Sequence, residues 1–233
     1  MTGDPPIRHA LIMAAGRGNR MRPLTDRMPK AMLPYEGGTL IGTSLALLHN
    51  AVPHVHVTVG YKSAMLAHYL MTAGVDSVLN TEGHSNAWWI HHTLLRHLDE
   101  PVLVLTADNI TDIDIGLLAA EYHTAGAPAC MLVPVKPIPA VEGDYITHRD
   151  GVVTRIDRQT PTDIYCSGIQ VLNPARVVDL ARDEGDFYTV WNQLIARNEV
   201  RVAGVYPKRG FSVDTLEQLA ALHESAERDP FAR

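Results

Sequence analysis

Cysteine and long apolar runs are both scarce in this chain. Only Cys130 and Cys166 occur among 233 residues, with neither the spacing of a metal site nor a disulfide framework. That usage fits a reducing cytoplasm and disfavours a secreted protein. The first apolar run, Ala10–Ala15, is too short for a signal-peptide core or a membrane span, and no other stretch approaches the ~18 uninterrupted apolar residues that a span requires. We therefore expect a cytoplasmic protein without a membrane partner.

Positive charge is also in short supply. The net charge of -6 lacks the basic excess of a general nucleic-acid binder, so no nucleic-acid partner is expected. Any charge that binds phosphate must then be concentrated locally. The sequence contains no linker, repeat or low-complexity tract. With 46% apolar and 20% charged residues, the chain can bury a sizeable core. Its length suits one large α/β domain or at most two small ones.

Short β-rich runs alternate with helical patterns along most of the chain. Such alternation is typical of a sheet of mainly parallel strands with helices on both faces, which binds ligands beyond the carboxyl ends of its strands. We therefore expect the chemistry in the loops that follow Ala14, Leu79 and Thr106. The predicted strands cover 9–14, 54–59, 76–79, 101–106, 129–135 and 200–206, with others between 152 and 172, and the predicted helices cover 40–50, 63–73, 88–97, 113–125, 174–182, 188–197 and the residues from 215 onward.

The loop after the first predicted strand is rich in glycine and in positive charge. Gly16 and Gly18 allow a tight turn that points backbone amides at an anion. Arg20, Arg22 and Lys30 add positive charge where a triphosphate would lie. An inert, solvated surface loop is the alternative, but the concentration of basic residues with two prolines in one such loop disfavours it. This loop is the candidate phosphate site.

The same loop matches neither of two familiar nucleotide motifs. Met21 stands where a dinucleotide-binding fingerprint needs its third glycine, and no Gly-Lys-Ser/Thr follows at the distance that a P-loop requires. Its longer pattern, A-A-G-x-G-x-R-M-x-P-L-T-x-x-x-P-K over 14–30, resembles the signature of the sugar-phosphate nucleotidyltransferase family. The resemblance implies one Rossmann-like α/β domain over 1–233, with a mainly parallel mixed sheet flanked by helices. Its nucleotide-binding half would cover about 1–125 and its acceptor-binding half about 126–233.

In that family the glycine-rich loop holds the nucleotide phosphates, while an arginine and a lysine stabilise charge on the triphosphate during attack. The matching residues are Arg20 and Lys30, which are therefore the expected catalytic pair. The resemblance also implies nucleotide contacts in this loop and after a later strand. These positions are Ala14, Ala15, Gly16, Gly18 and Ala107.

Two carboxylates are the expected metal ligands. Asp108 follows the apolar run 101–105 at a strand end, which suits Mg²⁺ because this ion takes one or two protein carboxylates together with substrate phosphates. In the resembling family the matching aspartate binds metal. The segment 211–215 is similar to a family segment that supplies a second ligand, here Asp214. An alternative stays open for Asp214, because an Asp-Thr pair before Leu216 also reads as a helix N-cap.

The segment 80–89 departs from hexose-specific members of the family, which usually carry a Leu-Gly-Thr-type sequence there. It resembles instead the bacterial phosphocholine cytidylyltransferase branch, as does 187–192. For Asn86 the alternative is a cap on a helix that begins at Ala87. The nucleotide contacts expected from this segment are Asn80, Ser85 and Asn86.

Aromatic residues in these two segments suggest an acceptor pocket. Trp88, Trp89, Tyr188 and Trp191 are either a cage for a cationic head group or core residues, since adjacent tryptophans point in different directions on a helix. Arg158 or Lys136 is the candidate cation for the acceptor phosphate. The expected acceptor-binding residues are Arg158, Tyr188, Trp191 and Asn192.

Together these patterns predict a Mg²⁺-dependent nucleotidyltransferase. An oxygen of a small phosphate- or phosphonate-bearing acceptor attacks the α-phosphorus of a nucleoside triphosphate, with CTP the expected donor, and pyrophosphate leaves. Two alternatives stay open: a sugar-1-phosphate uridylyl- or guanylyltransferase that uses the same site, and a non-catalytic nucleotide-sensing domain. The presence of Arg20, Lys30 and Asp108 together argues against a sensor, because a sensor can bind nucleotide without having all three residues.

Overall fold

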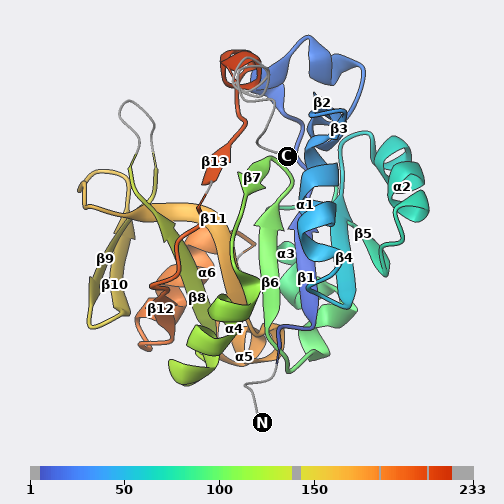
Figure 1. The fold of residues 1–233 in the computed structure, drawn as a ribbon. Coiled ribbons are helices and arrows are strands. Elements are labelled where there is room, and N and C mark those ends of the chain that lie inside the picture. Colours follow the sequence, from blue (N-terminus) through green and yellow to red (C-terminus); the bar gives the residue numbers. More distant parts are fainter. Residues whose placement is uncertain (1–5, 138–142, 184, 209, 222–233) are drawn as a thin grey trace.

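A computed structural model describes residues 6–137, 143–183, 185–208 and 210–221 (Figure 1). These residues build a mixed nine-stranded sheet in the order β5-β4-β1-β6-β11-β8-β12-β10-β9, with helices packed on both faces. The α/β fold and the mainly parallel mixed sheet expected from the sequence are thus confirmed. Within the same ranges, no helix combines the length and the apolar character needed to cross a membrane.

The first half of the sheet is parallel. β1 lies between β4 and β6, and its residues pair in register with His54–Thr58 on one side and Val102–Thr106 on the other. The chain runs outward from β1 to β4 and β5, then crosses back to β6, so the strand order reverses between β1 and β6. Open α/β sheets bind ligands at such a point. The bounds are β1 (His9–Met13), β4 (His54–Val59), β5 (Ser77–Asn80) and β6 (Val102–Thr106).

The second half of the sheet is mixed. β11 runs antiparallel between β6 and β8, while β12 is parallel to β8. β9 and β10 form a hairpin at the edge, joined by Asp150 and Gly151, which have φ values of 50° and 78°. Two such residues in succession are typical of a tight two-residue hairpin turn. The bounds are β8 (Cys130–Val135), β9 (Tyr145–Arg149), β10 (Val152–Asp157), β11 (Tyr165–Leu172) and β12 (Val200–Val202).

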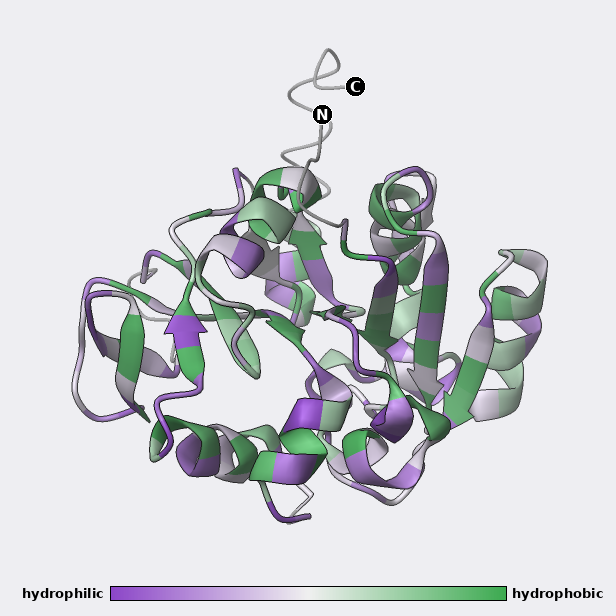
Figure 2. Cartoon of the chain, turned by 90° about the horizontal axis from the view of Figure 1, so that it is seen from below, coloured by the Kyte–Doolittle hydropathy of each residue, from purple (hydrophilic) through white to green (hydrophobic). Residues whose placement is uncertain are grey.

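Helices cover the two faces of the sheet through separate apolar clusters. α1, α2 and α4 pack on one face with residues such as Ile41, Leu66 and Leu118. α3, α5 and α6 pack on the other with residues such as Trp89 and Leu194. Figure 2 shows hydrophobic stretches along the strands and alternating hydrophobic and hydrophilic residues on the helices. The bounds are α1 (Leu40–Leu48), α2 (Ser63–Thr72), α3 (Trp88–His92), α4 (Ile115–Thr124), α5 (Pro174–Leu180) and α6 (Phe187–Ile195).

Two predicted elements end four or more residues earlier than expected. The helix predicted over 88–97 ends at His92, because Thr93 adopts an extended conformation, with φ -113° and ψ 170°. A 3₁₀ turn, Leu94–His97, follows it, with its first turn capped by the Thr93 hydroxyl. The strand predicted over 200–206 stops at Val202. Both errors place the end of an element wrongly without changing its type.

A third, smaller apolar cluster fastens loops beyond the carboxyl ends of β1 and β6. Met21 and Leu33 from the glycine-rich loop pack there with Ile110, Val213 and Leu219. β13 (Gly210–Ser212) pairs antiparallel with β7 (Asn109–Thr111), and Figure 1 shows this pair beyond the end of β6. A short hairpin of β2 (Pro34–Tyr35) and β3 (Gly38–Thr39) lies in the same region. The C-terminal segment is thereby brought to the loop that follows β1.

Candidate active site

The loop after β1 turns sharply at Gly18. This residue has a φ of 61°, and a Cβ added to it would lie 2.9 Å from the Cβ of Lys30. The hydroxyl of Thr25 donates a hydrogen bond to the Gly18 carbonyl oxygen at 3.0 Å, which closes the loop. At Gly16 an added Cβ would meet no atom within 4 Å. Gly18 is thus required by the turn and by its contact with Lys30, while Gly16 leaves open space at the end of β1.

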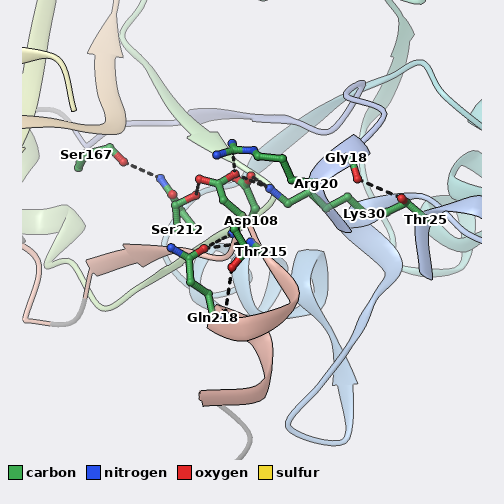
Figure 3. Close-up of polar contacts among 11 residues, drawn as sticks. Gly18, Arg20, Thr25, Lys30, Asp108, Ser167, Ser212, Thr215 and Gln218 are labelled. Atoms are coloured by element: carbon green, nitrogen blue, oxygen red, sulfur yellow. Dashed lines mark hydrogen bonds and ion pairs between the residues drawn. The ribbon is translucent and has the colours of Figure 1, made fainter. Parts of the chain in front are cut away.

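Four predicted residues meet in one charged cluster (Figure 3). Lys30 Nζ forms an ion pair with Asp108 Oδ2 and a second one, 2.8 Å long, with Asp214 Oδ1. Arg20 Nη2 also lies 2.8 Å from Asp214 Oδ1. The Ser212 hydroxyl donates to the other oxygen of Asp214 at 3.2 Å. Residues separated by up to 194 positions are therefore assembled at one point, although their catalytic and metal-binding roles stay predictions.

The charges in this cluster balance one another. Burial opposes ionisation of Asp214, but the hydrogen bond and charge of Lys30, with the charge of Arg20, outweigh burial and hold the pKa of this carboxyl below its usual range. The Lys30 side chain is only 14% exposed, whereas that of Arg20 is 70% exposed. An exposed pair is screened by water and contributes little, so Lys30 is the main counter-charge of both carboxylates.

Local structure leaves the Asp214 carboxylate available for cations. The buried Val213 donates its amide to the Asp108 carbonyl oxygen at 3.0 Å, which joins the segments that carry Asp108 and Asp214. The helical residues that follow are capped by Thr215, whose Oγ1 accepts from the Gln218 amide at 3.3 Å. Gln218 Oε1 accepts in return from the amides of Asp214 and Thr215, the pattern of a capping box. The cap considered for Asp214 is therefore made by Thr215.

A cavity of about 320 Å³ adjoins the charged cluster between the carboxyl ends of β1, β4 and β6. Predicted nucleotide-binding residues form much of its wall. Two expected contacts are absent from its lining: Gly18 lies against Lys30, and the exposed Asn80 accepts a hydrogen bond from the Glu82 amide at 3.0 Å. The residues that line it as expected are Ala14, Ala15, Gly16, Ser85, Asn86 and Ala107, beside Lys30 and Asp108.

Ser85 and Asn86 use their polar atoms within the protein. The Ser85 hydroxyl donates to the Gly185 carbonyl oxygen, and Asn86 Oδ1 accepts from the Phe187 amide at 3.0 Å. The N-cap of α3 is Ala87 and has no side-chain hydrogen bond, so the cap considered for Asn86 on this helix is wrong. Asn86 instead receives an amide from the first turn of α6. Both side chains fix the cavity wall to the loop before α6.

Sequence reasoning missed several residues of the cavity wall. Thr58 lies opposite Met13 in the β1–β4 register, and its Oγ1 accepts from the Ala14 amide at 3.2 Å. Its place beside the end of β1 follows from parallel pairing, which was the available signal. His84 is another missed residue of the lining, whereas Trp89, also in the wall, was considered as a cage or core residue. Trp89 is 1% exposed, and its buried indole N–H has no acceptor among the described residues.

The expected acceptor-binding residues are not in the lining of this cavity. Arg158 Nε lies 2.7 Å from Asp144 Oδ1, and the Tyr188 hydroxyl donates to the Ile156 carbonyl oxygen at 3.0 Å. Asn192 donates to the Tyr188 carbonyl oxygen at 2.9 Å. These contacts place the three side chains around α6 and the end of β10. Their roles toward an acceptor stay predictions.

The four aromatic residues considered as a cage lie in different surroundings. Trp88 stacks between two histidines, while Trp89 is buried at the cavity wall. Trp191 Nε1 donates to Gln170 Oε1 at 2.9 Å, and its ring stacks on Phe187 in the apolar cluster of that face. Tyr188 is bonded to the β10 backbone. These contacts favour the interpretation of Trp191 as a core residue. An aromatic cage for a cationic head group stays a prediction that the geometry does not support.

Comparisons with known proteins show which family this chain resembles. The family model of the MobA-like NTP transferase domain matches residues 10–228. N-acetylmuramate α-1-phosphate uridylyltransferase from Caulobacter vibrioides is 28% identical over 224 residues, which cover 89% of this chain and 91% of that protein. UTP–glucose-1-phosphate uridylyltransferase AglF from Haloferax volcanii is 24% identical over 71% of this chain and 72% of its own length.

Solved structures share the fold. UDP-glucose pyrophosphorylase in complex with UDP-glucose superposes with a TM-score of 0.77 at 14% identity, covering 96% of this chain and 99% of the other. CTP:phosphocholine cytidylyltransferase from Streptococcus pneumoniae gives a TM-score of 0.72 at 20% identity, covering 93% and 98%. The phosphocholine branch suggested by the sequence is thus one structural neighbour among several.

Proposed function

Because the chain belongs to the MobA-like NTP transferase family, we propose that it transfers a nucleoside monophosphate from a nucleoside triphosphate to the phosphate of a sugar 1-phosphate and releases pyrophosphate. The relatives named above are uridylyltransferases of glucose 1-phosphate and N-acetylmuramate 1-phosphate. They favour a sugar phosphate over the small CTP-dependent acceptor expected from segment 80–89. UTP is accordingly the first donor to test.

The observation that carries this proposal is the charged cluster at one end of the cavity. Lys30 and Asp108 belong both to the cluster and to the cavity wall, next to the open space at Gly16. A nucleotide in this cavity has its phosphates beside the Gly16 backbone and the Lys30 ammonium. Fixed positive charge at that place stabilises the charge that develops on the triphosphate as the acceptor oxygen attacks and pyrophosphate leaves.

The chain's own residues act here by position and charge. The closed turn at Gly18 and Thr25 holds the loop backbone, so Lys30 is presented from a fixed support. Arg20 reaches the same carboxylate from the solvent side and is free to move toward a bound phosphate, since its side chain is 70% exposed. Direct in-line attack needs no covalent intermediate with the protein, so binding geometry and electrostatics supply the catalysis.

Asp108 and Asp214 fit a divalent cation. The Lys30 ammonium contacts both carboxylates, which shows that one cation can reach an oxygen of each. Among the described residues, no group of three or more His, Cys, Asp or Glu side chains is placed to hold a metal. Two protein carboxylates completed by substrate phosphates are the usual arrangement for Mg²⁺. Such an ion, when bound, would neutralise phosphate charge and align the reacting groups.

Pyrophosphate release tests this proposal directly. The purified chain is assayed with each of the four common nucleoside triphosphates against glucose 1-phosphate, mannose 1-phosphate, N-acetylmuramate 1-phosphate and phosphocholine. We expect the highest kcat/KM with a sugar 1-phosphate. A preference for CTP and phosphocholine would restore the acceptor class first expected, and no turnover with any pair would refute the activity for these substrates.

A matched pair of arginine variants ties the activity to the cluster. Arg20→Ala removes a charge that contacts Asp214, whereas Arg22→Ala removes a charge of the same loop that pairs with Asp26 at 3.2 Å and is 62% exposed. We expect Arg20→Ala to lower kcat/KM by on the order of 10-fold or more. Arg22→Ala should stay within about 2-fold of the parent, since exposed ion pairs contribute little. Equal effects of both changes would point to general loop charge.

A further inference from the structure

A column of three parallel rings stands behind the cavity wall. His84 stacks on Trp88 with ring centroids 4.0 Å apart and an interplanar angle of 7°, and Trp88 stacks on His92 at 4.5 Å and 10°. The far end of the column is held by Asp183, whose carboxylate pairs with His92 Nε2. The near end, His84, lines the cavity. One face of the His84 ring therefore has a stacked aromatic support.

The loop that carries His84 is fixed on both sides of it. The His84 amide donates to the Thr81 carbonyl oxygen at 3.1 Å, in a turn where Gly83 has a φ of 81°. After His84, the Ala87 amide donates to the Gly185 carbonyl oxygen at 3.0 Å. The ring is thus presented from a braced turn, which limits the entropy lost when a ligand packs on it.

The residues that follow His84 in the loop are bonded within the protein or buried, whereas His84 is exposed. Ser85 and Asn86 direct their polar side-chain atoms to Gly185 and Phe187, and Trp89 is almost fully buried. His84 is exposed. His84 is therefore the exposed aromatic residue by which this loop lines the cavity, whose wall also includes Lys30 and Asp108 of the charged cluster.

We propose that His84 is the stacking platform for the nucleobase, which extends the column of rings by one. This inference rests on the proposed function, because a nucleotide with its phosphates beside Gly16 and Lys30 directs its base toward the loop of His84. Every base has a π face, so stacking contributes affinity and positions the base but discriminates little among the four nucleobases. His84 is then a nucleotide-positioning residue, and the selection of one base belongs to other groups in the wall.

The experiment measures binding by titration calorimetry with the triphosphate that supports the best turnover, and with inorganic tripolyphosphate. His84→Ala should raise the Kd of the nucleotide about 10-fold, within the range that loss of one stacking side chain gives. His84→Phe keeps an aromatic ring and should stay within about 3-fold of the parent. Binding of tripolyphosphate should be the same in all three. His97→Ala, an exposed histidine in the neighbouring 3₁₀ turn, is the matched control.

Trp88 gives a second readout at the proposed place. A base stacked on His84 adds to the column that contains Trp88, so nucleotide should change tryptophan emission in the parent. Trp88→Phe should keep binding and show a smaller change, the remainder coming from Trp89 in the cavity wall. Equal nucleotide Kd values for the parent and His84→Ala would overturn the proposed platform. So would an equal loss of nucleotide affinity in His84→Ala and His84→Phe, or weaker binding of tripolyphosphate in His84→Ala. A parent that binds no nucleoside triphosphate would instead refute the proposed function, and the platform with it.

Discussion

Titratable side chains gather at both ends of the parallel strands, but the two groups differ in composition and origin. Beyond the carboxyl ends, Lys30 pairs with two carboxylates that come from segments far apart in sequence. At the amino ends, imidazoles meet: His9 Nδ1 lies 3.1 Å from His56 Nε2, and the His9 ring also stacks on His54 at 4.9 Å. Opposite charges contact one another in the first group. In the second group imidazoles contact one another, with Glu100 and Asp76 beside them.

The histidines at the amino ends of the strands are surrounded by residues in or next to the same strands. Burial, followed by the charge of His9, lowers the pKa of His56, and burial also lowers the pKa of His9 although Glu100 acts to raise it. Asp76 contacts His54 at 3.2 Å, and Arg8 adds positive charge near His9. The comparison teaches that opposite charges favour the ionised form of Asp214 beyond the carboxyl ends of the strands, whereas burial at the amino ends opposes protonation of His9 and His56.

The largest expected effect comes from removing the charge of Lys30, the cation that lies beyond the carboxyl ends of the strands. Lys30→Met keeps most of the side-chain length without the charge. We expect kcat to fall by on the order of 10²-fold or more, because the group that stabilises charge on the triphosphate is lost. Steady-state pyrophosphate release measures this effect. Near-normal kcat in the variant would remove Lys30 from the mechanism.

Removal of one carboxylate should have the next largest effect. Asp108→Asn keeps the shape of the side chain but loses the charge that would hold a divalent ion. We expect activity to fall by roughly 10²-fold while thermal stability remains close to that of the parent. Rates across a Mg²⁺ titration and melting curves check this together. Normal turnover at low millimolar Mg²⁺ would show that Asp108 is not a required ligand.

The balance of charge also predicts how the free protein binds metal. Lys30 occupies the place between Asp108 and Asp214 that a divalent ion would need, so Lys30→Met should bind Mn²⁺ about 10-fold more tightly than the parent. Mn²⁺ binding without nucleotide can be followed by electron paramagnetic resonance, which does not depend on activity. Weaker or unchanged binding in the variant would contradict the idea that the two cations compete.

A smaller effect is expected at Asp214, where two variants distinguish a metal-binding role from the helix cap made by the adjacent Thr215. Asp214→Asn should lower activity several-fold, less than Asp108→Asn, with little change in melting temperature. Thr215→Ala removes the side chain that caps the following helical turn and should cost about 1 kcal/mol of stability with activity retained. Parallel assays and melting curves distinguish the two. The reverse pattern would make Asp214 the structural residue.

The smallest effect is expected at the amino end of the strands, and it depends on pH. The lowered pKa values mean that folded His9 and His56 bind fewer protons than in the unfolded chain, whose ordinary value is 6.5. Stability should therefore be present above that value and decline as the pH falls below it. We expect about 2–4 °C lower Tm near pH 5.5 than near pH 7.5, the size that ~1 kcal/mol gives in a domain of this length.

His56→Gln is the variant that tests this origin. It keeps a polar side chain next to Ser77 but cannot become charged in this range, so the decline of Tm should be shallower than in the parent. His97→Gln, which changes an exposed histidine, should leave the decline as it is. Parallel curves for the parent and His56→Gln would show that other groups cause the acid sensitivity.

Much of the fold followed from local pattern. The buried run 102–105 predicts a strand, and the alternation of elements predicts a sheet with helices on both faces, because those signals arise within a few neighbouring residues. Helix ends were harder to predict, as at His92, where the backbone conformation of Thr93 stops a helix that its residue types allow to continue. The loop of 14–30 was proposed as the phosphate site because its glycines, arginines and lysine lie close together in sequence, and that role stays a prediction.

The rest of the site depends on contacts that local pattern does not encode. Asp214 was named from a short segment, but its approach to Lys30 requires β13 to pair with β7. The sequence offered Asn86 as a nucleotide contact or as a cap for its own helix, and its oxygen accepts instead from the Phe187 amide, 101 positions away. Trp191 was read as a pocket residue or a core residue, and its bond to Gln170 on β11 favours the core.

By itself, the sequence determined the α/β fold, because that signal lies in residue types and short spacing. It also proposed the loop of 14–30 as a phosphate site and, with the help of a family resemblance, Asp108 and Asp214 as metal ligands. Only the tertiary structure decided that Lys30 holds both carboxylates and that His84 faces the cavity with Trp88 behind it. Long-range strand pairing and packing fix those positions, and the energies that select them come from contacts between segments far apart in the chain.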